Sequence, residues 1–524
     1  MAKPSRSRHT SRVPGKTCPP SVGRVLASVR TFALLGVDAH EVTVEVDVRG
    51  GLPTFSLVGL PDAAVRESRE RVRAALVNSG FEFPLKRITA SLAPSDLRKA
   101  GPGFDLAIAA ALLVASEQLS PTALDGVALS GELALDGGIR PVPGALAMAE
   151  AARRGGARAL VVAEPSAPEA ALAGVAVVAV PRLDRLHALG TEAEPDGAVP
   201  LLLSANGAGP AGLDLADLRG QPVLRRALEV AAAGGHSLLI TGPPGAGKSM
   251  AARRLPSLLP PLTPGEAVDV VRVAGACGRP LASAAACVRP FRAPHHTISA
   301  AGLVGGGSPP RPGEATLAHR GVLFLDELPE FRRDALEALR QPLEEGRVLI
   351  VRARHAVELP CRFQLVAAAN PCPCGHGDDS PSCKCPALSI RRYSTKLTGA
   401  LADRIDLSLR VEQPEAKTLR GPREEASSAV RERVLAARER QHGRLGGSCN
   451  AEMTSRETRV HCELEPDAQL LLDSSHRQFG LSGRGYERVL RVARTIADLA
   501  GRERIGADDL GEALTLRRRV GQPA

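Results

Sequence analysis

The segment Gly242-Pro-Pro-Gly-Ala-Gly-Lys-Ser249 lies between a short apolar run, Ser237–Thr241, and a stretch with helical spacing. It matches the pattern GxxxxGK[ST], in which the glycines allow backbone N–H groups to close around phosphate oxygens. In this pattern Lys248 reaches the β- and γ-phosphates, and the hydroxyl of Ser249 is a ligand for Mg²⁺. The sequence therefore predicts a site for a nucleoside triphosphate with magnesium. The residues expected to bind the nucleotide are Gly242, Pro243, Pro244, Gly245, Ala246, Gly247, Lys248 and Ser249.

Two adjacent carboxylates follow a second apolar run, in Gly321-Val-Leu-Phe-Leu-Asp-Glu327. An acid at the end of a buried strand beside a phosphate-binding loop can hold the Mg²⁺ shell, and its neighbour can orient and deprotonate the attacking water. We therefore expect Asp326 to hold the metal and Glu327 to activate the water.

A third apolar run, Phe363–Ala369, ends at Asn370. A polar side chain at this position could sense the γ-phosphate, although an Asn before a Pro is also an ordinary turn former. Its order after the other two motifs is that of the AAA+ ATPases, in which Asn370 would be the residue called sensor 1.

Four cysteines follow Asn370 within 14 residues, in the spacing CxC-x₈-CxC. Four thiolates suit tetrahedral Zn²⁺, although CxC is tighter than the usual CxxC. The alternatives are reduced cysteines without a metal and a redox sensor. The candidate zinc ligands are Cys372, Cys374, Cys383 and Cys385.

Two other segments carry residues that could have a function. Arg347–His355 alternates β-type and basic residues. It predicts a hairpin on which Arg352 and Arg354 contact DNA phosphates, the alternative being an ordinary charged hairpin. The pair His295-His296 is expected to pack or to lie between subunits, because such a pair is more often structural than ligating.

Charge and composition limit the classes of partner. The 524 residues include 67 Lys and Arg and 57 Asp and Glu, a net charge of +10 that permits nucleic-acid binding without establishing it. Aromatic residues make up only 2%, which argues against recognition of single strands by base stacking. The longest apolar run, Leu106–Ala115, has about half the length of a membrane-spanning helix, so we expect no membrane partner.

The chain is predicted to be an α/β multidomain protein. Residues 1–25 are basic, rich in Ser and Pro, and without the apolar stretch of a signal peptide, so we expect a disordered leader and a cytoplasmic protein. Strand-type runs such as Val42–Val48, Leu160–Ala163 and Val175–Val180 alternate with the helical stretches Ala63–Asn78 and Leu106–Ala115. The expected domains are an α/β domain at 26–190, a linker at 191–212, a second α/β domain at 213–414 and a helical domain at 415–524.

Several motifs together resemble one family over nearly the whole chain, the magnesium-chelatase-like AAA+ ATPases of the YifB/ComM family. The motifs are Arg289-Pro-Phe-Arg-Ala-Pro-His-His296, Gly305-Gly-Gly307, Arg311-Pro-Gly-Glu314, Asn370-Pro-Cys-Pro-Cys-Gly375 and Asp403-Arg-Ile-Asp406. The resemblance implies that ATP is the nucleotide and that the chain forms a homo-oligomer, a hexameric ring. It also implies that Arg404 is an arginine finger acting in a neighbouring subunit and that Arg484 is a sensor 2 arginine.

The same resemblance assigns a fold to each domain. Residues 26–190 are similar to a Lon-protease-like domain, of the ribosomal S5 domain 2-like fold. Gly103 stands at the position of its catalytic serine and Leu146 at that of its lysine, so the domain is expected to be non-proteolytic. Residues 213–414 would be the AAA+ P-loop core and residues 415–524 the helical lid.

Competence members of the family are branch-migration helicases, so the resemblance implies an ATP-driven DNA motor acting in recombination or natural transformation. The alternative is a chelatase-type ATPase that remodels a protein partner. An ATP-dependent peptidase is disfavoured by Gly103 and Leu146.

Overall fold

The computed structural model describes residues 26–189, 212–281, 286–307, 310–352, 355–377, 382–397, 401 and 404–517. The expected leader, and the expected linker except Gly212, lie outside the described residues. Contacts between residues divide the chain into two compact units. The first comprises residues 1–31, 42–140 and 181–194, and the second comprises residues 32–41, 141–180 and 195–524.

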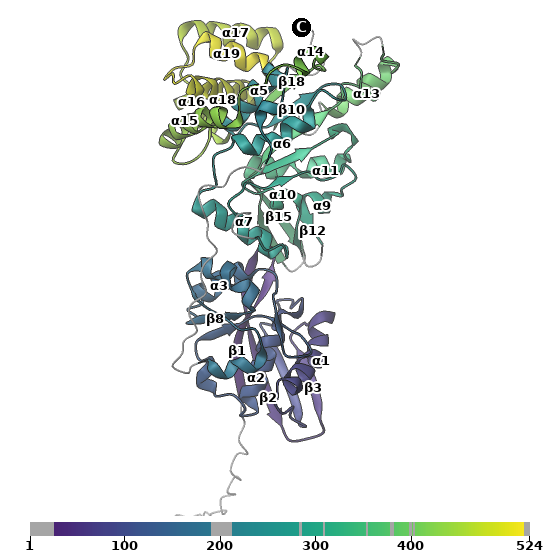
Figure 1. The fold of residues 1–524 in the computed structure, drawn as a ribbon, viewed down its shortest axis with the longest axis vertical. Coiled ribbons are helices and arrows are strands. Elements are labelled where there is room, and N and C mark those ends of the chain that lie inside the picture. The colour runs from purple at the N-terminus through teal and green to yellow at the C-terminus, as the bar shows by residue number, and fades with distance from the viewer. Residues whose placement is uncertain are drawn as a thin grey trace, which may run out of the picture. The chain divides into compact units, whose positions relative to one another are not determined.

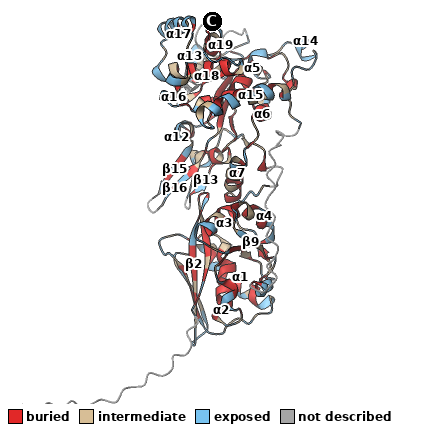
Figure 2. Ribbon diagram, turned by 90° about the vertical axis from the view of Figure 1, so that its left-hand side faces the viewer, coloured by how far each residue is buried: buried red, intermediate tan, exposed pale blue. Residues whose placement is uncertain are grey.

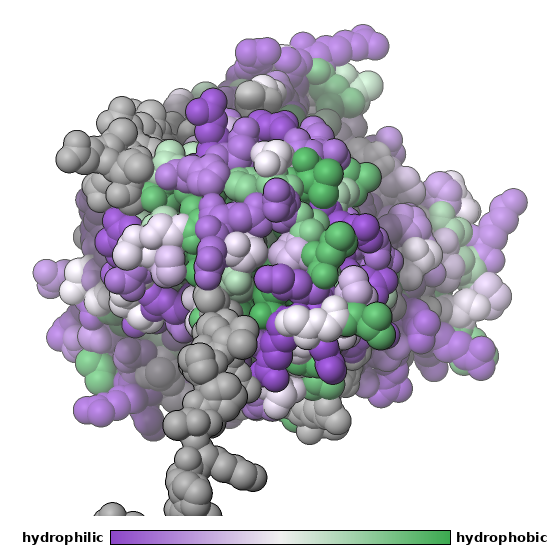
Figure 3. All heavy atoms as spheres, turned by 90° about the horizontal axis from the view of Figure 1, so that it is seen from below, coloured by the Kyte–Doolittle hydropathy of each residue, from purple (hydrophilic) through white to green (hydrophobic). Residues whose placement is uncertain are grey.

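The first unit is an α/β layer in which strands are hydrogen bonded in the order β3-β4-β2-β1-β5. Helix α1 begins at Asp62, whose carboxylate accepts a hydrogen bond from the N–H of Val65, and α2 is buried along its whole length because all but its first residue are apolar. Leu52 and Leu85 are exposed apolar side chains of this unit. Figure 3 shows hydrophobic residues scattered between hydrophilic ones on the face that it presents. The elements of this part of the chain are β1 (Leu26–Leu35), β2 (Asp38–Arg49), β3 (Thr54–Val58), α1 (Ala63–Asn78), β4 (Arg87–Ala93), α2 (Asp105–Ala115), β5 (Val127–Leu129), β6 (Glu132–Leu133) and β7 (Ile139–Arg140).

The hairpin between β1 and β2 contributes to the core of the second unit. Val37 is buried in one hydrophobic cluster with Val357 and Leu359, and Leu34 packs against that cluster. Gly36 has a φ of +68°, and a Cβ atom there would lie 2.4 Å from Cγ1 of Val357. The hairpin can therefore approach this cluster closely only with glycine at its turn.

A five-stranded sheet lies at the centre of the second unit, with the order β11-β14-β17-β10-β18. Neighbouring strands are parallel. Every residue of β10, β14 and β17 is buried, as expected for strands covered on both faces, whereas the edge strands β11 and β18 are partly buried (Figure 2 colours buried residues red). Helices α5 and α6 pack against this sheet. Helix α7 begins with a capping box between Thr263 and Glu266. The elements up to β18 are α3 (Ala145–Arg154), β8 (Ala159–Val162), α4 (Ala167–Ala170), β9 (Ala176–Ala179), α5 (Pro222–Gly234), β10 (Leu238–Thr241), α6 (Lys248–Leu258), α7 (Pro264–Ala276), β11 (Phe291–Arg292), α9 (Ala300–Val304), β12 (Gly305–Gly306), β13 (Arg311–Pro312), α10 (Glu314–Leu317), β14 (Val322–Leu325), the 3₁₀ helix η7 (Leu328–Glu330), α11 (Arg333–Ala338), α12 (Arg340–Glu345), β15 (Arg347–Arg352), β16 (His355–Pro360), β17 (Gln364–Ala369), α13 (Ala387–Leu397) and β18 (Leu407–Arg410).

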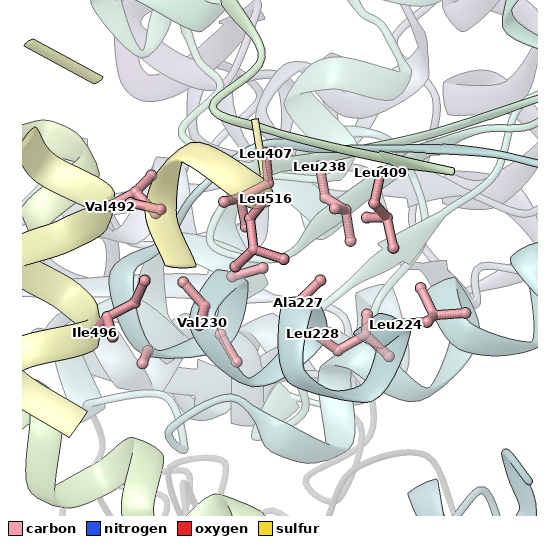
Figure 4. Close-up of a cluster of buried hydrophobic side chains, with 14 of the residues drawn as sticks. Leu224, Ala227, Leu228, Val230, Leu238, Leu407, Leu409, Val492, Ile496 and Leu516 are labelled. Atoms are coloured by element: carbon pink, nitrogen blue, oxygen red, sulfur yellow. The ribbon is translucent and has the colours of Figure 1, made fainter. Parts of the chain in front are cut away.

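The end of the chain is helical, as expected, and its helices gather beside α5 (Figure 1). Val492 and Ile496 of α18 and Leu516 pack with Leu224 and Leu228 of α5 in one apolar core (Figure 4). Among the described residues, no helix is long and apolar enough to cross a membrane. The helices are α14 (Ala416–Leu419), α15 (Ser427–Leu445), α16 (Ser455–His461), α17 (Pro466–Phe479), α18 (Gly483–Leu499) and α19 (Ala507–Thr515).

Candidate nucleotide-hydrolysis site

The glycine-rich loop connects β10 to α6, as its sequence predicts. Gly245 and Gly247 have φ values of +80° and +86°, which side chains with a Cβ rarely adopt, so both glycines are needed for the turn. The loop ends at the N-terminus of α6, where free backbone N–H groups and the helix dipole favour a phosphate. The local structure thus supplies the anion-binding geometry that the motif requires.

Lys248 points back into this loop and is almost fully buried. Its Nζ donates hydrogen bonds to the carbonyl oxygens of Gly242 at 2.6 Å and Pro243 at 2.9 Å, and to Oδ1 of Asn370 at 3.1 Å. Burial lowers the pKa of Lys248, although the charges of Asp326 and Glu327 oppose this shift. The ammonium group is therefore held at the point where the loop and the end of β17 meet.

The oxygen atoms expected to hold magnesium lie together. Oγ of Ser249 donates a hydrogen bond to Oδ2 of Asp326 at 2.7 Å, bridging the start of α6 and the end of β14. Hydroxyl and carboxylate oxygens are the ligands that Mg²⁺ prefers, so this pair fits the metal that accompanies a bound nucleotide. The adjacent residue, Glu327, has a left-handed backbone with a φ of +52°, and its N–H donates to Oδ1 of Asp326 at 3.0 Å.

Sequence reasoning did not connect His296 with this carboxylate pair. Nδ1 of His296 lies 3.4 Å from Oε2 of Glu327, and its ring lies 4.1 Å, between centroids, from that of His295. The expected packing role is thus combined with a contact to the proposed catalytic residue. The position of His296 in the sequence could have indicated this contact. His296 follows β11, which pairs in parallel with β14, so both strands end near Glu327.

Asn370 follows β17, whose Ala369 is level with Thr241 of β10 in the sheet. Its side chain accepts the hydrogen bond from Lys248. Tyr393, a residue of α13 that the motifs did not indicate, is buried in the same hydrophobic cluster as Ala369, the residue before Asn370. Burial raises the pKa of Tyr393 to about 12, so the phenol stays protonated at neutral pH.

Arg404 and Arg484 share one carboxylate, that of Glu344 at the end of α12. Nη2 of Arg404 lies 2.7 Å from Oε1 of Glu344, and Nη1 of Arg484 lies 3.5 Å from the same atom. The two arginines, 80 positions apart in the sequence, therefore lie together in the fold, with Arg484 exposed and Arg404 largely buried. Asp403, the first residue of the finger motif, lies outside the described residues.

The last residue of that motif, Asp406, is buried and tied to the helical region. Its carboxylate accepts hydrogen bonds from Nη1 of Arg488 at 3.0 Å and from the N–H of Ser237 at 3.1 Å, and it lies 3.5 Å from Nδ1 of His236. Burial alone would raise the pKa of Asp406, but His236, Arg488 and the Ser237 N–H together lower it to about 2. The segment that carries Arg404 is thus anchored by a charged carboxylate.

The four sequence-predicted cysteines do come together. Their Sγ atoms all lie within 4.8 Å of one another, and three of the pairs are at 3.3, 3.7 and 3.8 Å. A tetrahedral ion with Zn–S bonds of about 2.3 Å would place its sulfur atoms about 3.8 Å apart, so the donor set fits Zn²⁺. The N–H of His376 and the neighbouring thiols lower the pKa of Cys374 to about 6, which favours a thiolate.

The remaining candidates lie away from this cluster. β15 and β16 form the predicted antiparallel hairpin; Arg352 is the last residue of β15, while Arg354 lies outside the described residues. Gly103 has no side chain and Leu146 is buried on α3, so neither position offers a nucleophile or a base.

A parallel sheet with a phosphate-binding loop, an acidic pair and a polar residue at the carboxyl ends of adjacent strands defines the class of P-loop nucleoside triphosphatases. The chain matches the family described as magnesium chelatase, subunit ChlI, over residues 214–419, with further ChlI matches over 44–166 and, for its C-terminal part, over 424–517.

Relatives that match nearly the whole chain identify the family more specifically. A protein named YifB from Salmonella typhimurium is 44% identical over 495 residues, covering 94% of this chain and 97% of that protein. The competence protein ComM of Haemophilus influenzae is 45% identical over 501 residues, covering 94% and 98%. The chain belongs to the YifB/ComM family of magnesium-chelatase-like AAA+ ATPases, which confirms the resemblance found in its motifs.

Proposed function

We propose that the protein binds and hydrolyses ATP with Mg²⁺ at the loop 242–249. The proposal is supported above all by two hydrogen bonds, one from Lys248 to Asn370 and one from Ser249 to Asp326. Lys248 would hold the β- and γ-phosphates, Ser249 and Asp326 the magnesium, and Asn370 the γ-phosphate. Glu327 would orient and deprotonate the attacking water.

We propose further that the active assembly is a homo-hexameric ring in which Arg404 is the arginine finger of a neighbour's site and Arg484 is a sensor 2 arginine. Arg404 would stabilise the charge of the departing γ-phosphoryl group. Their shared contact with Glu344 supports a common functional region for both cations. In this proposal residues 213–414 are the AAA+ core, 415–524 the lid, and 26–190 a non-proteolytic Lon-protease-like domain joined by the linker 191–212.

The substrate of the motor is proposed to be DNA, with branch migration during recombination or natural transformation as its activity. The support is the name of one relative, a competence protein, together with the net charge of +10. A chelatase-type ATPase that remodels a protein partner is the alternative, supported by the ChlI family match.

The test is ATPase activity with and without DNA, combined with a change in the β15–β16 hairpin. Arg352→Ala with Arg354→Ala should leave basal ATPase intact, weaken DNA binding and make its salt dependence shallower by about one released ion per lost contact. Arg347→Ala is the control, since Arg347 pairs with Glu345 and Glu358 at the base of the same hairpin. A wild-type protein without DNA binding at low salt would favour protein remodelling.

We also propose that Cys372, Cys374, Cys383 and Cys385 bind one structural Zn²⁺. The sulfur separations support this over reduced cysteines without a metal. Zinc content of the purified protein, expected at one ion per chain, tests it.

A further inference from the structure

The cysteine site, meaning the thiols of Cys372, Cys374, Cys383 and Cys385, lies directly beside the parts that build the nucleotide pocket. Cys372 is two residues from Asn370, whose side chain accepts the hydrogen bond from Lys248. Cys385 is two residues from the first residue of α13. The site is therefore connected to the pocket along the chain at both of its ends.

A close contact between Gly375 and the ring of Pro244 connects the site to the phosphate-binding loop. Gly375, the residue after Cys374, has a φ of +90°, and a Cβ atom there would lie 2.9 Å from both Cγ and Cδ of Pro244. Real Cβ atoms essentially never come within 3.0 Å of another heavy atom, so the turn touches the loop closely enough to exclude a methyl group. Pro244 is a central residue of the loop that would surround the phosphates.

A third connection runs through α13. The ring of Tyr393 is buried in the cluster that contains Leu328, Phe331 and Ala369, the residue before Asn370. α13 also packs against η7, the turn that directly follows Glu327. Residues that follow the second cysteine pair thus support both Asn370 and the segment after the acidic pair.

We propose that metal bound at the cysteine site fixes the nucleotide pocket, so that the affinity for ATP depends on the occupancy of this site. One ion would join the Cys372–Cys374 turn, which contacts Pro244 and follows Asn370, to the segment Cys383–Cys385, which leads to α13 and Tyr393. Without the ion, no metal holds these two segments together, and the phosphate-binding loop 242–249 loses the packing of Gly375 against Pro244. Every phosphate-binding group is still present. This proposal rests on the zinc site and the ATP site proposed above.

The first experiment removes the metal from the full chain with a zinc chelator and then restores Mg²⁺. Binding of a fluorescent ATP analogue is measured together with zinc content. We expect the affinity to fall about tenfold or more and to return with Zn²⁺ but not with additional Mg²⁺. Unchanged affinity after loss of the zinc would overturn the proposal.

The second experiment replaces none of the four cysteines, and zinc content is measured for each variant because the N–H of Gly377 donates to Sγ of Cys372. Gly375→Ala places a methyl group against Pro244, whereas Gly377→Ala, at a φ of +89°, approaches Arg410 and Pro371 instead. The two variants therefore carry similar backbone strain and differ in the contact with the loop. We expect both to keep their zinc and only Gly375→Ala to lose affinity for the analogue.

The possible failures are distinguishable. Equal affinity of the two glycine variants, with zinc retained, contradicts the coupling alone. A purified protein without zinc contradicts the zinc site and the coupling with it. A zinc-loaded protein that binds no ATP analogue contradicts the proposed function itself.

Discussion

Nζ of Lys248 and Oδ1 of Asn370 are 3.1 Å apart, although 122 positions separate these residues in the sequence. The parallel pairing of β10 with β17 brings them together, because Thr241 and Ala369 are level in the sheet and the next residues leave it side by side. A cation and an amide at this position can both contact the γ-phosphate of a bound nucleotide.

Lys248→Ala should abolish ATP binding, whereas Glu327→Gln should bind ATP normally and fail to hydrolyse it. The first change removes the cation that contacts phosphate, and the second removes the group that activates water. Equilibrium binding of a labelled nucleotide and steady-state ATPase assays separate the two effects. Equal loss of binding in both variants would contradict the assigned roles.

Arg404→Ala should bind ATP but lose hydrolysis, because a finger stabilises only the transition state. Mixing this variant with Lys248→Ala subunits should restore part of the activity, since each kind of subunit supplies the group that the other lacks. The measurement is ATPase rate against mixing ratio. A finger that acts across subunits is contradicted if no ratio gives more than the sum of the separate rates.

His296→Ala should lower kcat about tenfold, or ~1.4 kcal/mol of transition-state stabilisation, with little change in KM. The reason is that His296 lies 3.4 Å from Glu327 and would act by positioning that carboxylate. His295→Ala is the matched control, because Nδ1 of His295 lies 2.9 Å from the hydroxyl of Thr297 instead. A similar loss in both variants would indicate a general packing role.

Asp406→Asn should lower the free energy of unfolding by about 2 kcal/mol near neutral pH. The folded-state pKa of about 2 lies below the ordinary value of 3.8, so this stabilisation is present above about pH 4 and is lost as pH falls towards 2. Denaturant unfolding at several pH values should show the difference from wild type shrinking in that window. Asp334→Asn, which removes an exposed ion pair with Arg332, should change stability little.

Local motifs predicted the parts of the site that lie within one segment or at the ends of buried strands. The loop, the acidic pair and Asn370 could be placed because each follows an apolar strand, and the carboxyl ends of these parallel strands lie at the same edge of the sheet. The helix Ala63–Asn78 also has the bounds predicted for it. The contacts of Glu327 with His296 and of Glu344 with Arg404 could not be placed. They depend on which strands are neighbours and on how the helical region packs, and neither is encoded in spacing along the chain.

The glycine turn at the end of β1 affects how this chain can be divided. Residues 32–41 belong to the second unit, where Leu34 and Val37 cover Val357 and Leu359 of β16. A fragment that began at Gly212 would keep the entire ATP-binding loop and yet expose an apolar strand to water, which favours aggregation. We therefore expect the region that carries the loop to stay soluble only when residues 32–41 are expressed together with it.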